Sequence, residues 1–314
     1  MGNGMESKVY ICNTGEDSIS IVDLNKLQQI GKIGLQQGIT LRGIRKPTLG
    51  PHHMVIDYNK QYIYTANSHN ATISIVDIIK NKVIDDICVG SCPTHLQMCK
   101  KNKTLYVVNS DSNSVSAIDL ETSAPLAQIP VGAMPHDMKL SLDEKKLYVV
   151  NVDAHSLTVI DTNSNEQERT ILTPPQPYHI TLSRDGKLLY IINTGYTLME
   201  KGSISVVELT NYSIIHRITV GKMPMEAVID DQGLYLYIAD TEMNAINVLE
   251  IQSQKVIERI DVGRMPGCIG KSADGRYLLT ANIQDNTLSV VDLMNLKLLE
   301  QIPVGIEPNG MLCI

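Results

Sequence analysis

The chain has 314 residues, of which 43% are hydrophobic, and its formal net charge is −7. Because the lysines and arginines are scattered and the balance is acidic, we expect no nucleic-acid partner. No apolar run approaches the length that spans a bilayer, so we expect no membrane partner either.

The first residues, 1–7, are short and polar and lack the apolar stretch of a signal peptide. We therefore interpret them as an N-terminal tail and expect a cytoplasmic protein. The chain has six cysteines, and they recur in no paired pattern, which argues against a disulfide framework.

Short β-type runs follow the tail at 8–13, 18–23 and 27–33, and the same set of runs then returns along the chain. The segment 93–132 shows the set in full, as HLQMC, TLYVV, SVSAID and APLAQIPV, separated by polar turn residues. Enrichment in Val and Ile and the short run length favour strands over helices. The last residues, 309–314, form a single run of the first type.

A proline opens each repeat. The seven prolines lie 42 residues apart, except for one gap of 47, and are Pro51, Pro93, Pro135, Pro177, Pro224, Pro266 and Pro308. An Asn or Asp follows six of them by 16 residues, and an acidic residue usually follows that by ten, where we expect it to cap the turn into the last strand. Seven units of four strands predict an all-β fold, a seven-bladed β-propeller in a single domain over residues 8–314. The C-terminal strand is expected to complete the N-terminal blade and close the ring.

The repeats carry a recurring tetrapeptide, YVVN at 106–109 and 148–151, with the variants YTAN at 64–67 and YIIN at 190–193. The turns SLDE at 141–144 and SADG at 272–275 accompany it. In these features the chain resembles the YVTN-repeat β-propeller family over nearly its whole length. The resemblance implies the fold, but little about activity, because the functions of that family are diverse. The family typically has Gly or another small residue two places after the repeat proline, and six of the seven units here depart from that pattern.

In those six units the second position after the repeat proline carries a side chain that can bind a metal: His53, His95, Asp137, His179, Glu226 and Cys268. In the seventh unit this position is Gly310. In a propeller the first strand of each blade lines the central axis, so we expect these residues to form a ring at the mouth of the channel. Five of the eight histidines lie one or two places after a repeat proline. Such clustering favours a functional site over chance placement.

We predict that His53, His95 and His179 bind one transition metal ion, either Zn, Cu or Fe, because imidazole suits these metals. Glu226 is a candidate fourth ligand or general base, while Asp137 and His136 are candidates for orienting ligands and moving protons. Cys268 is a candidate soft ligand or nucleophile. Two alternatives remain: a ligand site without metal, or side chains that only hydrogen-bond through water.

Two insertions, at about 35–50 and within 194–203, fall in connections on the same face as the ring. We expect them to help bind a substrate, together with residues beside the ring: His52, Tyr178, Arg42, Arg45 and Tyr196. Met134, Met223 and Met265 each precede a repeat proline, where they could either favour a soft metal or fill gaps between blades.

Together these features predict a metal-dependent enzyme that acts on a small-molecule or peptide-like substrate by hydrolytic, lyase or oxidative chemistry. The alternative is a non-catalytic scaffold that binds a protein partner, a peptide or a small ligand on the same face. Because Gly310 leaves a gap in the ring, we expect a substrate to enter beside it.

Overall fold

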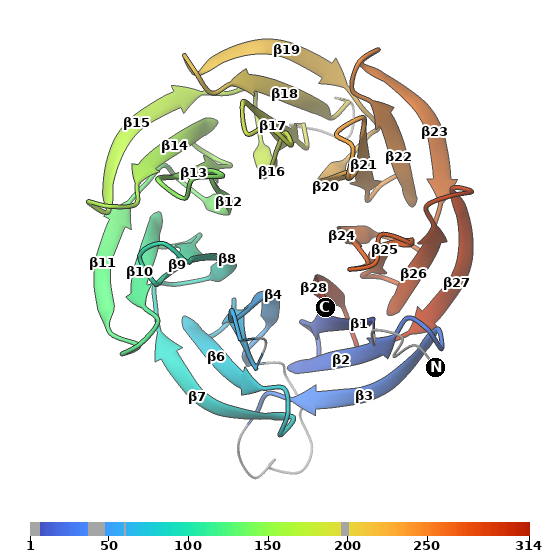
Figure 1. Cartoon of the computed structure of the whole chain (residues 1–314), viewed down its shortest axis with the longest axis horizontal. Coiled ribbons are helices and arrows are strands. Elements are labelled where there is room, and N and C mark those ends of the chain that lie inside the picture. Colours follow the sequence, from blue (N-terminus) through green and yellow to red (C-terminus); the bar gives the residue numbers. More distant parts are fainter. Residues whose placement is uncertain (1–6, 37–47, 60, 196–200) are drawn as a thin grey trace.

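The computed structural model describes residues 7–36, 48–59, 61–195 and 201–314, and it arranges their strands in seven four-stranded antiparallel sheets. The sheets stand around a central channel as the blades of a propeller (Figure 1). No helix in the described part of the chain is long and apolar enough to cross a membrane. The seven-bladed β-propeller predicted from the repeats is confirmed.

Each blade is built from consecutive strands, with one exception. The six regular blades, from inner to outer strand, are β4 (Pro51–Ile56), β5 (Tyr62–Asn67), β6 (Thr72–Asp77) and β7 (Lys82–Cys88); β8 (Pro93–Cys99), β9 (Thr104–Asn109), β10 (Ser114–Asp119) and β11 (Pro125–Pro130); β12 (Pro135–Leu140), β13 (Lys146–Asn151), β14 (Ser156–Asp161) and β15 (Glu166–Leu172); β16 (Pro177–Leu182), β17 (Leu188–Asn193), β18 (Ser203–Glu208) and β19 (Ser213–Thr219); β20 (Pro224–Ile229), β21 (Tyr235–Asp240), β22 (Ala245–Glu250) and β23 (Lys255–Asp261); β24 (Pro266–Lys271), β25 (Tyr277–Asn282), β26 (Thr287–Asp292) and β27 (Lys297–Pro303).

The exceptional blade joins the two ends of the chain. Its order is β28 (Pro308–Cys313), β1 (Lys8–Asn13), β2 (Ser18–Asp23) and β3 (Gln28–Gly34). Strand β28 pairs antiparallel with β1, and the backbones of Lys8 and Ile314 exchange hydrogen bonds of 3.0 and 2.9 Å. The predicted closure of the ring by the C-terminal strand is therefore confirmed.

The hydrophobic core lies between neighbouring blades. In one typical cluster Tyr106 and Val108 of β9 pack against Met138 of β12 and Val149 of β13, all fully or almost fully buried. The middle strands are buried on both faces, which explains why their sequences are continuous apolar runs such as TLYVVN. The outer strands are largely exposed. Each buried aliphatic side chain contributes about 1.5–3 kcal/mol to stability.

Two repeated polar residues hold the turns of each blade. The buried Asn109 donates to the hydroxyls of Ser114 and Ser116 at 3.2 and 2.9 Å, and equivalent bonds recur in other blades. The acidic residue at the end of the third strand accepts backbone N–H groups from the following turn; in Asp77, Oδ1 accepts from Ile79 and Lys80 at 2.9 Å each. The predicted capping role of this acid is confirmed where the contact is described.

Every inner strand carries an irregularity directly after its proline. In β12, Pro135 faces Asn151 and Asp137 faces Val150, so two residues of the inner strand oppose one residue of β13. The other blades show a register shift at the equivalent place. A bulge of this kind interrupts the alternation of side chains along a strand. It explains how both residues after the proline, which are neighbours in the chain, can line the channel in five of the seven blades.

Candidate functional site

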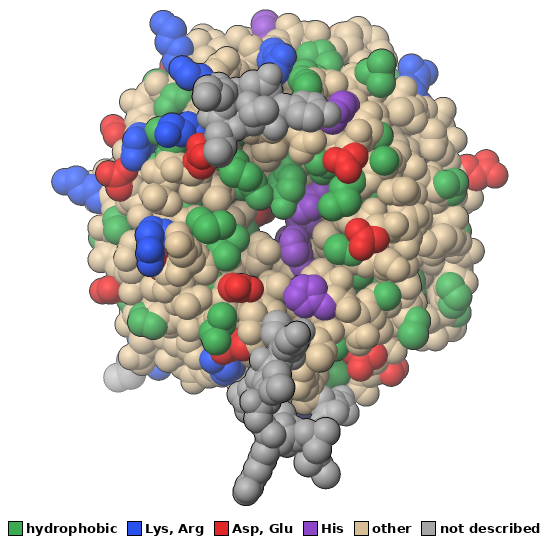
Figure 2. Space-filling view, turned by 180° about the vertical axis from the view of Figure 1, so that it is seen from behind, with side chains coloured by type: hydrophobic (Ala, Val, Ile, Leu, Met, Phe, Trp, Pro, Cys, Tyr) green, Lys and Arg blue, Asp and Glu red, His purple; other side chains and the backbone are tan. Residues whose placement is uncertain are grey.

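The inner strands enclose a cavity of about 60 Å³ at the mouth of the central channel, enough for a few water molecules. Histidine side chains gather around this hollow on the face shown in Figure 2. Apart from Ile283, all of the lining residues occupy the two places after a repeat proline: His52, His53, His95, His136, Tyr178, His179, Met225, Glu226, Gly267, Cys268, Asn309 and Gly310. The structure thus brings most of the predicted ring into one cavity.

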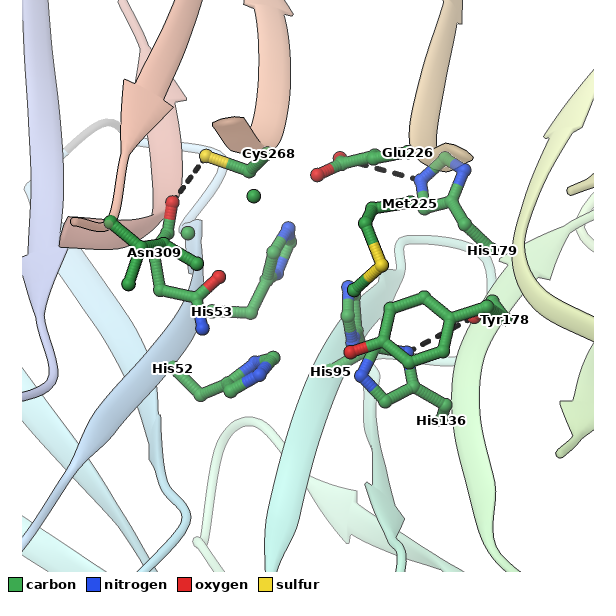
Figure 3. Close-up of a pocket in the computed structure, with 13 residues that line it drawn as sticks. His52, His53, His95, His136, Tyr178, His179, Met225, Glu226, Cys268 and Asn309 are labelled. Atoms are coloured by element: carbon green, nitrogen blue, oxygen red, sulfur yellow. Dashed lines mark hydrogen bonds and ion pairs between the residues drawn. The ribbon is translucent and has the colours of Figure 1, made fainter. Parts of the chain in front are cut away.

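The centre of the arrangement is an imidazole between two carboxylates. Nε2 of His179 lies 3.4 Å from Oδ2 of Asp137 and 3.3 Å from Oε1 of Glu226. Figure 3 shows the contact between His179 and Glu226. The three side chains come from the consecutive blades that begin with β12, β16 and β20. All three are mostly buried, with side-chain exposures of 12% for His179, 5% for Asp137 and 16% for Glu226.

Backbone groups of the next blade orient each of these side chains. The N–H of Ile180 donates to Oδ2 of Asp137 at 2.9 Å, and the N–H of Ala227 donates to Nδ1 of His179 at 3.4 Å. The N–H of Ile269 donates to Oε2 of Glu226 at 3.3 Å. Because Nδ1 of His179 accepts, the proton of the neutral ring sits on Nε2, where it faces both carboxylates.

Burial and mutual charge separate the pKa values of the two carboxylates. Burial raises the pKa of Asp137 above its ordinary value, although the neighbouring His179 opposes the shift. Burial also acts to raise the pKa of Glu226, but charge and hydrogen bonding from His179 outweigh it and leave the pKa lowered. Burial lowers the pKa of His179, and the two carboxylates reverse this and raise it. Two carboxyl groups with opposite shifts are the arrangement by which a site holds one acid and one base together.

The three predicted metal ligands lie in the same cavity but do not face a common point. The rings of His53 and His95 are stacked, with centroids 4.4 Å apart and planes 26° from parallel. His179 directs Nε2 at the two carboxylates. Within the described residues no group of three His, Cys, Asp or Glu side chains is already arranged to hold a metal ion. The assignment of a metal to His53, His95 and His179 stays a prediction, and this geometry does not favour it.

Cys268 differs from the reactive thiol expected from the sequence. Its Sγ donates a hydrogen bond to the backbone oxygen of Asn309 (Figure 3). Burial, followed by the charge of Glu226, raises the pKa of the thiol well above its ordinary value. The neutral thiol is therefore favoured over the thiolate that nucleophilic attack or metal ligation needs.

The gap that we expected at Gly310 is filled by backbone. A Cβ at this position would lie 2.2 Å from the backbone oxygen of His52 and 2.7 Å from Cα of His53. Strands β28 and β4 thus approach too closely for any side chain. The substrate entrance beside Gly310 stays a prediction, and this close contact between β28 and β4 does not favour it.

The predicted substrate residues divide into two groups. His52 and Tyr178 line the cavity. Arg42, Arg45 and Tyr196 lie outside the described residues, as do most of the two predicted insertions. Four lining residues were not predicted: Met225, Gly267, Asn309 and Ile283. The first three directly follow a repeat proline, a signal that could have found them, whereas Ile283 lies after β25 and carries no such signal.

Comparison with known proteins supports the fold. Residues 95–242 match the family model of YNCE-like β-propellers. No curated protein matches the sequence.

Several solved structures share the architecture at low sequence identity. Hydrazine synthase of Kuenenia stuttgartiensis is 19% identical, with 87% of this chain and 92% of that chain covered and a TM-score of 0.76. A functionally unknown protein from Desulfotomaculum acetoxidans DSM 771 is 13% identical, with 98% of each chain covered and a TM-score of 0.79. A putative 6-phosphogluconolactonase from Bacteroides fragilis NCTC 9343 is 14% identical, with 100% of this chain and 99% of that chain covered and a TM-score of 0.79. At such identities the likeness shows the fold alone. The seven closed four-stranded blades show a seven-bladed β-propeller, and the YNCE-like match over residues 95–242 is consistent with the resemblance to YVTN-repeat propellers.

Proposed function

We propose that the protein binds a small polar molecule at the mouth of its channel and transfers protons to and from it. The observation that carries the proposal is the position of His179, whose Nε2 lies 3.4 and 3.3 Å from two carboxylates inside a cavity. A carboxylate held beside an oriented imidazole can accept a proton from a bound molecule, and a second carboxyl group can return a proton at another atom. Such transfer supports hydrolytic and lyase chemistry alike.

The roles follow from the surroundings of each group. Glu226, with a lowered pKa, is the proton acceptor, and Asp137, with a raised pKa, is the proton donor. His179 links the two, and Tyr178 and His52 border the space that the bound molecule would occupy. The volume of about 60 Å³ favours a reacting group of a few atoms over a bulky one.

The test is a screen of small hydroxy acids, lactones, esters and amides by ligand-observed NMR, followed by turnover of each binder. We expect Glu226→Gln to preserve the shape of the site, and so the binding, and to reduce turnover by about 10²–10⁴-fold. The control is His216→Gln, which changes an exposed histidine on the outer strand β19. Turnover that is equal in wild type, Glu226→Gln and His179→Gln would refute the proposal.

A protein-binding scaffold is the second candidate, and one observation favours it. Met134, Met223 and Met265 stand at equivalent places just before the inner strands and are 38%, 37% and 39% exposed. Exposed methionines adapt to varied partner surfaces. In this case a partner would bind equally well to wild type and Glu226→Gln, and no small molecule in the screen would be turned over.

A further inference from the structure

Three histidines of the cavity belong to three consecutive blades and face one another. They are His52 on β4, His95 on β8 and His136 on β12 (Figure 3). Their ring centroids are 5.6 Å apart for His52–His95, 5.6 Å for His52–His136 and 5.0 Å for His95–His136. The ring planes are inclined to one another by 63°, 80° and 60°.

These distances between ring centroids match those of three imidazoles bound to one metal ion. Three imidazoles bound through nitrogen at about 2.1 Å to one tetrahedral ion have ring centres about 5 Å apart. Mutually inclined rings can each place the ion in their own plane. The nearly parallel His53 and His95 rings cannot do so together, since their planes stay separated.

Two of the three rings already have the tautomer that binds metal. Nδ1 of His52 contacts the backbone oxygen of Thr94 at 3.2 Å, and Nδ1 of His136 contacts that of Tyr178 at 3.0 Å. A carbonyl oxygen only accepts, so each Nδ1 donates, and the lone pair of the neutral ring is on Nε2. Histidines that bind metals commonly donate their other ring nitrogen to a backbone carbonyl in this way, which fixes the ring orientation.

The third ring has a buried nitrogen without a hydrogen-bond partner in the described part of the chain. Nδ1 of His95 is buried and has no hydrogen-bond partner among the described residues. Its Nε2 lies 3.7 Å from Oδ1 of Asp137, beyond hydrogen-bond distance. His95 is only 6% exposed, so an unpartnered nitrogen here is costly. A metal ion bound among His52, His95 and His136 would give a nitrogen of His95 a partner and relieve that cost.

We propose that His52, His95 and His136 form a binding site for one divalent metal ion of the zinc class, with a fourth position open to water or substrate. Three nitrogen ligands and an open position are typical of catalytic rather than structural zinc sites. This set shares only His95 with the trio predicted from the sequence. The inference does not rest on the proton-transfer function, because metal binding is measured without any substrate.

The experiment uses the full chain without a histidine tag, treated with a chelator and then titrated with Zn²⁺ against a chromophoric competitor. We expect one equivalent to bind, and Co²⁺ in its place to give the intense visible absorption of a four-coordinate ion. His95→Gln and His136→Gln should each weaken Zn²⁺ binding by at least about 100-fold, since loss of a ligand exceeds the effect of an outer partner. The control is His216→Gln on the outer strand β19, which should bind Zn²⁺ as wild type does.

A second measurement covers the case in which a variant fails to fold. Long-range ¹⁵N NMR of the wild-type imidazoles, with and without Zn²⁺, identifies the rings whose nitrogens bind the ion. Shifts at His52, His95 and His136 support the proposal. No stoichiometric binding would overturn it, as would shifts at His53 and His179 without His136. Absence of Zn²⁺ binding by the wild type, with proton-transfer turnover intact, would refute the metal site alone.

Discussion

Gly310 occupies the one place in the ring without a side chain, because the backbone of β4 fills the space where a Cβ would be. A Cβ at Gly310 would clash with the backbone oxygen of His52 and Cα of His53. Because both are backbone atoms, no change of side-chain rotamer can relieve the clash. The same contact sets how far β4 can lie from the closing strand. Because Gly310 has no side chain, β4 can lie close to β28, and this helps position His52 and His53 in the cavity.

Gly310→Ala should therefore destabilise the protein by about 1–3 kcal/mol, as overpacking of a tight core typically does. Urea unfolding followed by circular dichroism measures the effect. Gly34→Ala is the matched control, because a Cβ at Gly34 meets nothing within 4 Å. We expect that control to change the unfolding free energy by no more than about 0.5 kcal/mol. Equal stability of the two variants would contradict the close packing of β28 against β4.

At the scale of the element, the bulge after each proline creates the site. Regular alternation would send Tyr178 and His179 to opposite faces of β16, but the register shift between Pro177 and His179 lets both line the cavity. The turns between the third and fourth strands are held differently, by an acidic residue whose carboxylate accepts hydrogen bonds from backbone N–H groups. Asp161 is the strongest case, since it also pairs with Lys146 at 2.8 Å.

Asp161 should make the stability of its blade depend on pH. The hydrogen bond from Lys146, with those from the backbone of Asn163 and Ser164, lowers the pKa of Asp161 to about 2. Because the folded pKa lies below the unfolded value of about 3.9, this contribution is present above pH 4 and is lost as the pH falls toward 2. We expect Asp161→Asn to be less stable than wild type at pH 7, with the difference shrinking between pH 4 and 2.

Urea midpoints at pH 7, 4 and 3 measure this difference. Asp153→Asn, at an exposed loop position, is the control and should follow the wild-type curve. A difference between wild type and Asp161→Asn that stays constant across this range would show that the carboxylate charge is not what stabilises the turn.

At the scale of the whole molecule, the cavity exists because the ring is closed. The interface between the last and first blades contains Val9 and Ile11 of β1 packed with Leu279 of β25 and Leu288 of β26. Strand β28 covers the inner edge of β1 and contributes Asn309 and Gly310 to the cavity wall. The closure of the ring and the shape of the cavity therefore depend on the same contacts of β28.

Deletion of residues 306–314 should open the ring. It exposes the edge of β1 and removes one wall of the cavity, so we expect loss of cooperative thermal unfolding and the appearance of aggregates. Size-exclusion chromatography and calorimetry measure both. The control is a circular permutant. It links Ile314 to Ser7 through a short hairpin loop and has its new ends in the turn between β7 and β8. This permutant keeps every strand and should fold as wild type does. A deletion variant that unfolds cooperatively as a monomer would contradict this role of β28.

The sequence by itself determined the repeat, the four strands per unit, the number of blades and the closing strand. These follow from local patterns of apolar runs, prolines and turn residues, which each unit repeats. It also identified the column of residues that lines the channel, because a repeat register marks equivalent positions without any knowledge of distance.

Only the tertiary structure decided how those side chains face one another. The stacking of His53 on His95, the two carboxylates around His179 and the trio of His52, His95 and His136 depend on bulges and on contacts between blades. The filled space at Gly310 depends on the approach of β28 to β4, strands more than 250 residues apart in the chain. A side chain's direction at a bulge and the spacing between two blades are set by packing over the whole ring, and no local stretch of sequence encodes either.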